Sequence, residues 1–327
     1  MNFYATPEYL DVISEVYFKG KRASVEDVRI GEDVLRLLVV NDSRVIINAQ
    51  FLDYHEPLDE AEAALSSRTY PYSNFVVRDF VRPARWEECL HDGFELAPCV
   101  DWSMFPTFEH YKIFILNRRR SLIREYQRLS RRLAEQIGPI TFRMNDDHDD
   151  VLELARLWKK RQLRKSGETD YFADPRTMES LELFRQRGLL TASTLRAAGR
   201  LVSVHLGFVH EGVWGGWVFA YDPEFRKYSC GHQLIGKMLE ESHRLGHHQF
   251  DSSIGSEPYK LVYATHARVL GTIGRPPLRQ RLVERLKREL KGRNPDLLET
   301  ARELKRELRR KKSIYVSWLR GTEILAG

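Results

Sequence analysis

The chain has 327 residues, of which 42% are hydrophobic and 30% charged, the composition of an ordinary globular protein of one or two domains. No apolar run reaches the roughly 18 residues that span a bilayer, and the start MNFYATPEYL lacks the pattern of a signal peptide, so we expect no membrane span and a cytoplasmic location. The net charge of +6 does not by itself indicate nucleic-acid binding, and three cysteines without metal-ligand spacing fit a reducing compartment.

The first segment, residues 1–116, is predicted to be a mixed α/β unit. A helix is expected around PEYLDVISEVYF. The apolar runs DVLRLLVV and RVIINAQF, which Asn-Asp-Ser separates, predict a β-hairpin, and the apolar segment HYKIFIL closes the unit.

A basic connecting helix is predicted next, over residues 117–137. Leucines and a tyrosine recur at helical spacing, and Gly138-Pro139 ends the pattern. The seven arginines between Arg118 and Arg132 fit a solvated helix face, with contact to nucleic acid as the alternative.

Residues 138–274 alternate strands and helices. A strand, ITFRMN, precedes a helix that begins in DDHDD, where aspartates favour the positive end of the helix dipole; we interpret DDHDD as a helix start and not as a metal site. A helix around RTMESLELFRQRG then leads to three strands joined by turns short enough for antiparallel hairpins: LLTASTLRA, RLVSVHLGFVH and GVWGGWVFAYD. A helix, the strand HHQFDSSI, a short helix from Glu257 and the strand ARVLGTIG follow.

The tail, residues 275–327, is predicted to form a basic helical hairpin and an apolar end, IYVSWL. Between Arg275 and Lys312 there are 15 Lys or Arg against 6 Asp or Glu, a net charge of +9. Leucines at core spacing indicate packing on the domain or in a homodimer, and the charge suits an acidic carrier protein or an acidic peptide.

Groups that bind anions are concentrated directly before the helix in YDPEFRKYSCGHQLIGKMLEESHRLG, residues 221–246. The first turn of a helix leaves backbone N–H groups without partners and carries the positive end of the dipole. Arg226 and Lys227 supply charge, Ser229 can cap the helix or bind phosphate, and Gly231 permits close backbone approach. We therefore expect a phosphate here; a capped helix with solvent-facing cations is the alternative.

The order of elements resembles the Gcn5-related N-acetyltransferase (GNAT) fold. The resemblance rests on GRLVSVHLGF, AYDPEFRKYSCGHQL and FDSSIGSEPYK, in that order. Gly138 to about Gly274 is similar to the BioF2-like or cellulose-biosynthesis acetyltransferase branch, which is related to the FemX and FemAB peptidyltransferases. The family commonly has Pro in place of Cys230, and Gly in place of Ser252 or Ser253.

This resemblance implies an α/β fold of the α+β type with a central mixed, mostly antiparallel sheet. Two GNAT-like halves are expected, a degenerate one at 1–116 and an acyltransferase domain at 138–274, with the helical hairpin at 275–327. It also implies an N-acyltransferase that needs no metal. The donor would be acyl-CoA, carrying acetyl or a longer chain, or an acyl carrier protein, and the acceptor an amine of a sugar, a peptide or a small molecule that attacks directly.

The resemblance also assigns site residues. The donor pyrophosphate is expected at Arg226, Lys227, Ser229, Gly231 and His232. His205, mid-strand, is the expected general base, because the free pKa of histidine lies near neutrality. Asp251 would orient His205 or bind the amine, or else cap the turn DSSIG, and Tyr259 and Lys260 match the Tyr-Lys pair of the family. Tyr259 or Tyr263 would protonate the departing thiolate. The substrate is expected near Trp217, Tyr221 and Asp222.

Other functions remain open from the sequence. The same fold supports aminoacyl-tRNA-dependent transfer of the FemX kind, in which the basic hairpin grips RNA, and a non-catalytic RNA-binding or scaffold protein is a third hypothesis. Cys230 at a helix start would have a lowered thiol pKa, which permits an acyl-enzyme, although direct transfer needs none. His243, His247 and His248 lack the companions of a zinc site.

Overall fold

The computed structural model describes residues 3–30, 33–45, 73–91, 94–166, 168 and 170–273. The predicted basic hairpin at 275–327 lies outside these residues. No helix in the described ranges is long and apolar enough to cross a membrane.

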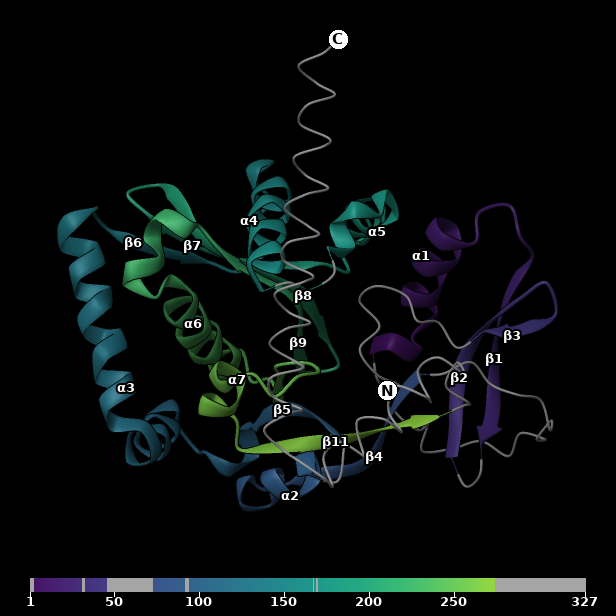
Figure 1. Cartoon of the computed structure of the whole chain (residues 1–327), viewed down its shortest axis with the longest axis horizontal. Helices are drawn as coiled ribbons and strands as arrows, with labels where there is room; N and C mark the ends of the chain where they lie inside the picture. The colour runs from purple at the N-terminus through teal and green to yellow at the C-terminus, as the bar shows by residue number, and fades with distance from the viewer. Residues whose placement is uncertain are drawn as a thin grey trace, which may run out of the picture.

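An eight-stranded sheet forms the centre of the described chain (Figure 1). Its strands in spatial order are β4 (Ser73–Val81), β11 (His266–Ile273), β5 (Glu95–Asp101), β10 (Gln249–Asp251), β9 (Val213–Tyr221), β8 (Arg200–His210), β7 (Thr191–Ala197) and β6 (Ile140–Arg143). Neighbouring strands are antiparallel except β9 and β10, which run parallel. The predicted mixed, mostly antiparallel sheet is thus confirmed, including the hairpins that join β7, β8 and β9.

A second, three-stranded antiparallel sheet contains β1 (Ala23–Ile30), β2 (Asp33–Val40) and β3 (Ser43–Val45). Asn41 and Asp42 connect β2 to β3 with φ of 50° and 61°. Two consecutive positive φ values are typical of the tight hairpin turn whose twist matches the strands, and Asn and Asp tolerate them. The predicted hairpin is confirmed for β2 and for Ser43–Val45, while the rest of RVIINAQF lies outside the described residues.

Helices cover both faces of the large sheet (Figure 1). They are α1 (Pro7–Tyr17), α2 (Trp86–His91), α3 (Phe108–Gln136), α4 (Asp150–Ser166), α5 (Pro175–Gln186), α6 (Cys230–Arg244) and α7 (Pro258–Tyr263). One apolar core joins α1, α4 and α5 to one face of β8 and β9, and a second joins α3, α6 and α7 to the other. Both sides of these central strands are therefore buried, which explains their long apolar runs.

The helix α3 differs from the prediction. The segment HYKIFIL and the arginine-rich segment form one helix, Phe108–Gln136, so the helix begins before the predicted residue 117. Arg119 has non-helical φ and ψ of −144° and 42°, which marks a kink between the two parts. The domain division stays a prediction, but β4 and β5 from the first segment lie in the same sheet as the strands of 138–274.

The strands β9 and β10 separate part-way along their length. They pair from Val213 to Gly215 on β9, and β10 ends at Asp251, opposite Gly215. On its other side β9 carries a bulge: Leu206 of β8 lies opposite Val218 and Gly207 opposite Gly216, which leaves Trp217 as the extra residue. A bulge bends its strand and increases the local twist. The sheet therefore opens beside residues 216–221 of β9.

The bulge depends on glycine at the facing strand. A Cβ on Gly207 would overlap the carbonyl oxygen of Gly215 and lie 2.9 Å from Cα of Gly216, whereas a Cβ on Gly236 of α6 would meet nothing within 4 Å. We expect Gly207→Ala to lower the free energy of unfolding by about 1–3 kcal/mol, because backbone atoms cannot move aside. The matched control Gly236→Ala should raise it by up to about 1 kcal/mol, through helix propensity. Urea denaturation measures both changes, and equal stabilities would contradict this account of the bulge.

Candidate functional site

A cavity of about 290 Å³ lies where β9 and β10 separate. It is lined by residues of both strands, the turn after β10, α4 and its following loop, α6 and α7: Lys159, Leu163, Glu168, Tyr171, His205, Gly216, Trp217, Val218, Phe219, Ile235, Phe250, Ser252, Ser253, Ile254, Glu257, Tyr259, Lys260 and Tyr263. Four predicted catalytic or acid residues, His205, Tyr259, Lys260 and Tyr263, thus come together. We call this the reaction cavity.

His205 projects from β8 into the reaction cavity beside Gly216, where a Cβ would overlap its Nε2 atom. Its side chain is buried, and within the described part of the chain its Nδ1 has no hydrogen-bond partner. A buried polar atom without a partner costs free energy, so it is typical of a site that a ligand completes.

Burial, together with the positive charge of Lys260, lowers the pKa of His205 to about 3. The expectation of an ionisation near neutrality for this residue is therefore wrong, because a charged imidazole here would lose water and face another cation. His205 is neutral at pH 7 and can accept a hydrogen bond or a proton. It is a weaker base than a free histidine.

Two lysines, from different helices, line the reaction cavity. Lys260 of α7 is buried, pairs with Glu257 at 3.1 Å and donates to the carbonyl of Ile254. Lys159 of α4 donates to the carbonyl of Phe219 at 3.5 Å, and its burial lowers its pKa. The nearby carboxylates Glu168 and Glu257 act to raise that pKa, so the cavity holds charges of both signs.

Two phenols line the same cavity from α7. The ring of Tyr259 stacks on Phe219 with centroids 5.9 Å apart, and in the described chain its hydroxyl makes no hydrogen bond. The hydroxyl of Tyr263 instead contacts Nδ1 of His232 at 3.1 Å. Burial raises the pKa of both tyrosines, so each stays protonated at neutral pH, and Tyr259 is the phenol that is free to donate.

Asp251 stabilises the turn after β10 that borders the reaction cavity. Its carboxylate accepts from the backbone N–H of Ser253 at 2.7 Å and lies 3.3 Å from the Arg268 guanidinium. Ser253 has φ of 63°, a left-handed conformation that this hydrogen bond stabilises. The turn-capping interpretation of Asp251 is thus confirmed, while its predicted orienting contact with His205 stays a prediction.

The segment before α6 forms a short 3₁₀ helix, Pro223–Tyr228, and then Ser229 with φ of 52°. Arg226 and Lys227 are exposed, and no ion pair of either is present among the described residues. Ser229 makes no side-chain capping bond to α6, which leaves the first N–H groups of that helix without this partner. The predicted phosphate site therefore presents two cations and a helix N-terminus.

Two residues predicted for the pyrophosphate have other environments. A Cβ on Gly231 would lie 2.8 Å from the Phe219 ring, so this glycine lets α6 pack closely on β9. His232 is held between Tyr126 at 2.8 Å and Tyr263 at 3.1 Å, and burial lowers its pKa to about 4. Its imidazole thus links α3, α6 and α7, and the predicted role of His232 at the pyrophosphate stays a prediction.

Cys230 also differs from the expectation. The thiol is buried and its Sγ lies 3.7 Å from the carbonyl of Phe225. Burial raises the pKa of the Cys230 thiol to about 12, where a position at a helix start had been expected to lower it. A thiol that stays protonated is a poor nucleophile, which argues against an acyl-enzyme at Cys230.

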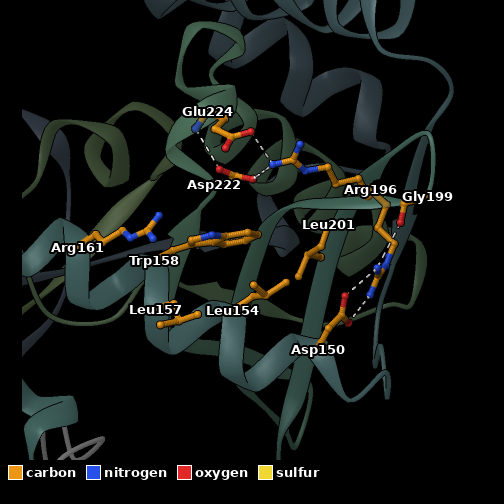
Figure 2. A pocket seen from close by; sticks show the side chains of 11 residues that line it. Asp150, Leu154, Leu157, Trp158, Arg161, Arg196, Gly199, Leu201, Asp222 and Glu224 are labelled. Atoms are coloured by element: carbon orange, nitrogen blue, oxygen red, sulfur yellow. Dashed lines mark hydrogen bonds and ion pairs between the residues drawn. The ribbon is translucent and has the colours of Figure 1, made fainter. Parts of the chain in front are cut away.

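The three predicted substrate residues separate in space. The Trp217 indole packs against the core that contains α1, where its N–H donates to the Tyr4 hydroxyl at 3.1 Å, and Trp217 also borders the reaction cavity. Asp222 lies in a different cleft, beside Trp158, where it caps Pro223–Tyr228 and accepts from Arg200 at 2.8 Å (Figure 2). Asp222 therefore stabilises the loop before α6, and its predicted role in substrate binding stays a prediction. Tyr221 ends β9, and its proximity to a substrate stays a prediction.

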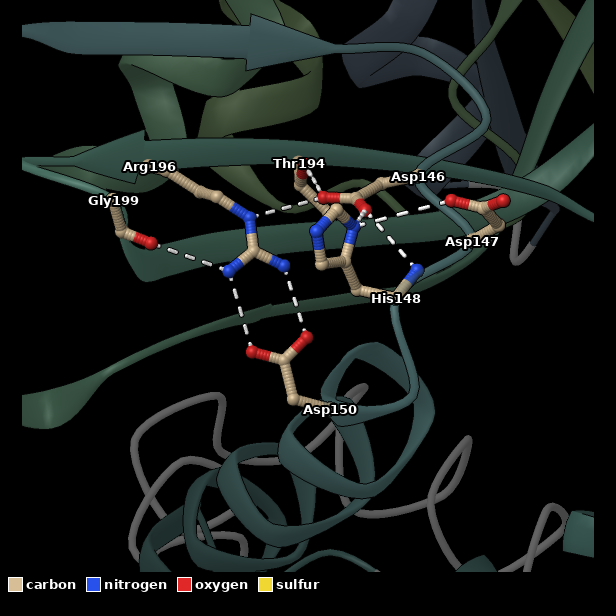
Figure 3. A network of polar contacts seen from close by, with 7 residues as sticks. All are labelled: Asp146, Asp147, His148, Asp150, Thr194, Arg196 and Gly199. Carbon is tan, nitrogen blue, oxygen red and sulfur yellow. Dashed lines mark hydrogen bonds and ion pairs between the residues drawn. The ribbon is translucent and has the colours of Figure 1, made fainter.

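The DDHDD segment forms a polar network (Figure 3). Asp146 accepts from Thr194 at 2.6 Å and from Arg196 at 3.1 Å and contacts His148 at 2.5 Å. Burial acts to raise the pKa of Asp146, but these hydrogen bonds lower it to about 2. α4 then begins at Asp150, as predicted. Asp146, Asp147 and His148 could together offer metal-ligand atoms, but Arg196 already neutralises Asp146.

Comparison with known proteins assigns the fold. Residues 118–261 match the family model described as the acetyltransferase (GNAT) domain. The chain has a GNAT fold. The matched segment contains the loop before α6 and every residue that lines the reaction cavity except Tyr263. No curated protein matches the sequence.

Solved structures with a similar fold include FemX, at 12% identity and a TM-score of 0.48, with 82% of this chain and 90% of FemX covered. L-PGS from Bacillus licheniformis has 11% identity and a TM-score of 0.41, with 90% of this chain and 99% of L-PGS covered. PaiA N-acetyltransferase from Thermoplasma acidophilum, in complex with coenzyme A, has 16% identity and a TM-score of 0.27, with 33% of this chain and 75% of PaiA covered. Likenesses this distant add no evidence on donor or acceptor.

The lowered pKa of His205 predicts a pH dependence of stability. The pKa is about 3 in the folded chain against an ordinary 6.5, so between these values the unfolded chain binds more protons and the free energy of unfolding falls as pH is lowered. His205→Gln should remove this contribution and make the fall between pH 6.5 and 4.5 shallower, by up to about 1.4 kcal/mol per pH unit. Denaturant unfolding at several pH values measures the slopes. Exposed His110→Gln is the control, and equal slopes for wild type and His205→Gln would contradict the burial of a neutral imidazole.

Proposed function

We propose that the chain is an N-acyltransferase that transfers an acyl group from a thioester to an amine. The observation that carries this proposal is the reaction cavity, which places a neutral imidazole, a protonated phenol and the free edge of β9 together. The exposed cations before α6 belong to the same loop-helix unit, which packs on β9 through Gly231. The GNAT match over residues 118–261 supports a transferase.

The donor in this proposal is acyl-CoA or the phosphopantetheine arm of an acyl carrier protein. Phosphate binds well at helix N-termini and beside cations. α6 has 15 residues, and its first turn follows Arg226 and Lys227 and lacks a side-chain cap. A pyrophosphate at this position would let the rest of the donor reach the reaction cavity along Ile235 and Phe219.

The chemistry requires a new C–N bond and loss of the C–S bond. As the amine nitrogen attacks the thioester carbon it becomes cationic, and His205 accepts its proton directly or through water. A weak base suffices at this stage, because the attached nitrogen is far more acidic than the free amine. Tyr259 donates its proton to the departing thiolate, and Lys159 and Lys260 stabilise negative charge that develops in the cavity.

Aminoacyl-tRNA-dependent transfer is the second candidate, because Arg226 and Lys227 would equally suit the phosphates of an RNA end. The two candidates differ in the donor consumed. Release of free thiol from acetyl-CoA in the presence of an amine panel would support the proposal. No thiol release from acetyl-CoA or longer acyl-CoA, together with salt-sensitive binding of tRNA, would overturn it in favour of the second candidate or of a non-catalytic RNA-binding protein.

The phosphate contacts give a first prediction on donor binding. Arg226→Ala with Lys227→Ala should weaken coenzyme A binding at least about tenfold, because each charge-assisted hydrogen bond contributes roughly 1.5–3 kcal/mol. Calorimetry with coenzyme A measures the change. Lys19→Ala with Lys21→Ala is the matched control, since these exposed cations follow α1 and Lys21, like Lys227, lies over an aromatic ring. Unchanged affinity in the folded loop variant would place the pyrophosphate elsewhere.

The imidazole gives a prediction on turnover. His205→Gln should lower kcat and kcat/KM together by about 10²-fold, the low end for a general base, since the pKa of His205 is about 3. For the same reason, any ionisation of kcat/KM near neutrality should persist in the variant.

His210→Gln is the control for this turnover prediction, because His210 lies at the end of the same strand and outside the reaction cavity. Activity of His205→Gln close to that of wild type would make His205 a structural residue. Loss of an ionisation near neutrality only in His205→Gln would show that the pKa rises when substrate binds.

A further inference from the structure

A second cavity, of about 300 Å³, is lined mainly by residues of α3 and α6. Figure 1 shows the places of these two helices in the fold. We call it the α3–α6 groove. Most of the lining surface is apolar, and its aliphatic side chains are Ile115, Leu116, Ile123, Ile140, Leu195 and Leu239. A cavity of this size is at the lower end of those that hold small molecules and is lined as they usually are. It is too small for a helix or a strand of another chain.

Gly236 is the feature that points to a ligand. It lies in the middle of α6 and borders the groove, although glycine in a helix interior costs about 1 kcal/mol relative to alanine. Gly207, Gly216 and Gly231 are each explained by an atom that a Cβ would strike. At Gly236 a Cβ would meet nothing within 4 Å, and its φ is not positive. Neither packing nor backbone conformation requires this glycine, and a side chain longer than that of alanine would enter the groove.

Polar groups also border the groove, among them Gln127, Ser130 and Gln233. Tyr126, His232 and Tyr263 form a hydrogen-bonded chain, and Tyr263 borders both the groove and the reaction cavity. Lys112 and Lys237 border the groove in exposed pairs with Glu109 and Glu240, and Glu240 also borders it, so two ammonium groups face one carboxylate of the lining. Exposed pairs of this kind are weak, so these ammonium groups can turn to another anion.

We propose that the α3–α6 groove binds a single linear aliphatic chain with an anionic head, as in a fatty acid. The chain lies along the aliphatic walls and over Gly236, and the head accepts hydrogen bonds from Lys112 and Lys237. Each methylene removed from water contributes about 0.8 kcal/mol, so a chain of medium length gains enough to bind without a specific polar contact inside. This site is distinct from the reaction cavity, and it does not depend on the proposed acyl transfer.

The test is calorimetric titration of the full chain with dodecanoate. Wild type should bind it, and Gly236→Leu should bind at least about tenfold more weakly, because the leucine side chain occupies the groove. Gly236→Ala, which adds one methyl group, should stay within about threefold of wild type and controls for the change in helix propensity. Dodecyltrimethylammonium, with the same chain and a cationic head, should bind more weakly than dodecanoate.

Absence of dodecanoate binding to wild type, or equal affinity of wild type and a folded Gly236→Leu, would overturn the site. Equal affinity for the two head groups would overturn the role of Lys112 and Lys237. Turnover separates a free fatty acid from the acyl chain of the donor. Gly236→Leu should use acetyl-CoA and dodecanoyl-CoA as wild type does, whereas loss of dodecanoyl-CoA turnover alone would show that the groove holds a thioester-linked chain without an anionic head and would overturn the proposal. Gly236→Leu should bind coenzyme A as wild type does. A failure of the acyl-transfer proposal would appear in the coenzyme A experiments, and a failure of the groove proposal would appear in the dodecanoate titration.

Discussion

The separation of β9 from β10 is the constraint on which the described site depends. Paired strands satisfy each other's backbone N–H and C=O groups, so a strand can separate from its neighbour only where other groups form hydrogen bonds to its backbone. Side chains of α4 form such hydrogen bonds to β9. Lys159 donates to the Phe219 carbonyl, and the Gln162 amide, oriented by its hydrogen bonds, donates to the same carbonyl and accepts from Tyr221 N–H, each at 3.2 Å. The edge of β9 can therefore stay unpaired without another strand beside it. An acyl donor that bound along this edge would displace the hydrogen bonds of two side chains, and it would not have to displace a paired strand.

Burial decides the protonation states in this opening. The pKa of His205 is lowered and that of Tyr259 raised for the same reason, since both lose water when charged. The result is an uncharged acceptor and an uncharged donor that line the same cavity. Lys159 and Lys260 lie at a boundary with glutamates and carbonyl oxygens, which limits the cost of burying them. A cavity arranged in this way can move protons without holding a permanent ion pair at its centre.

The sequence predicted the strands and helices of 138–273 well, because apolar runs, short turns and helix starts are local signals. It also brought His205, Tyr259, Lys260 and Tyr263 together through motif resemblance. It missed Lys159 and Glu168, which no motif marks and which reach the cavity only because α4 packs on β9. The predicted pKa values of His205 and Cys230 were wrong for one physical reason: spacing along the chain carries no information on burial.

The first segment is part of the site and not only a neighbour of it. Backbone carbonyls of Leu96 and Pro98 on β5 accept from Gly255 and Ser252, which fixes the turn that forms the cavity floor. Arg118 and Tyr111 of α3 donate to the carbonyls of Ala264 and Tyr263, at the end of α7. The segment that carries Tyr259 and Lys260 is therefore held at both ends by residues that precede 119. A GNAT domain cut out at the boundary of its sequence match would lose these anchors, because 118–261 excludes β5, the first part of α3 and the end of α7.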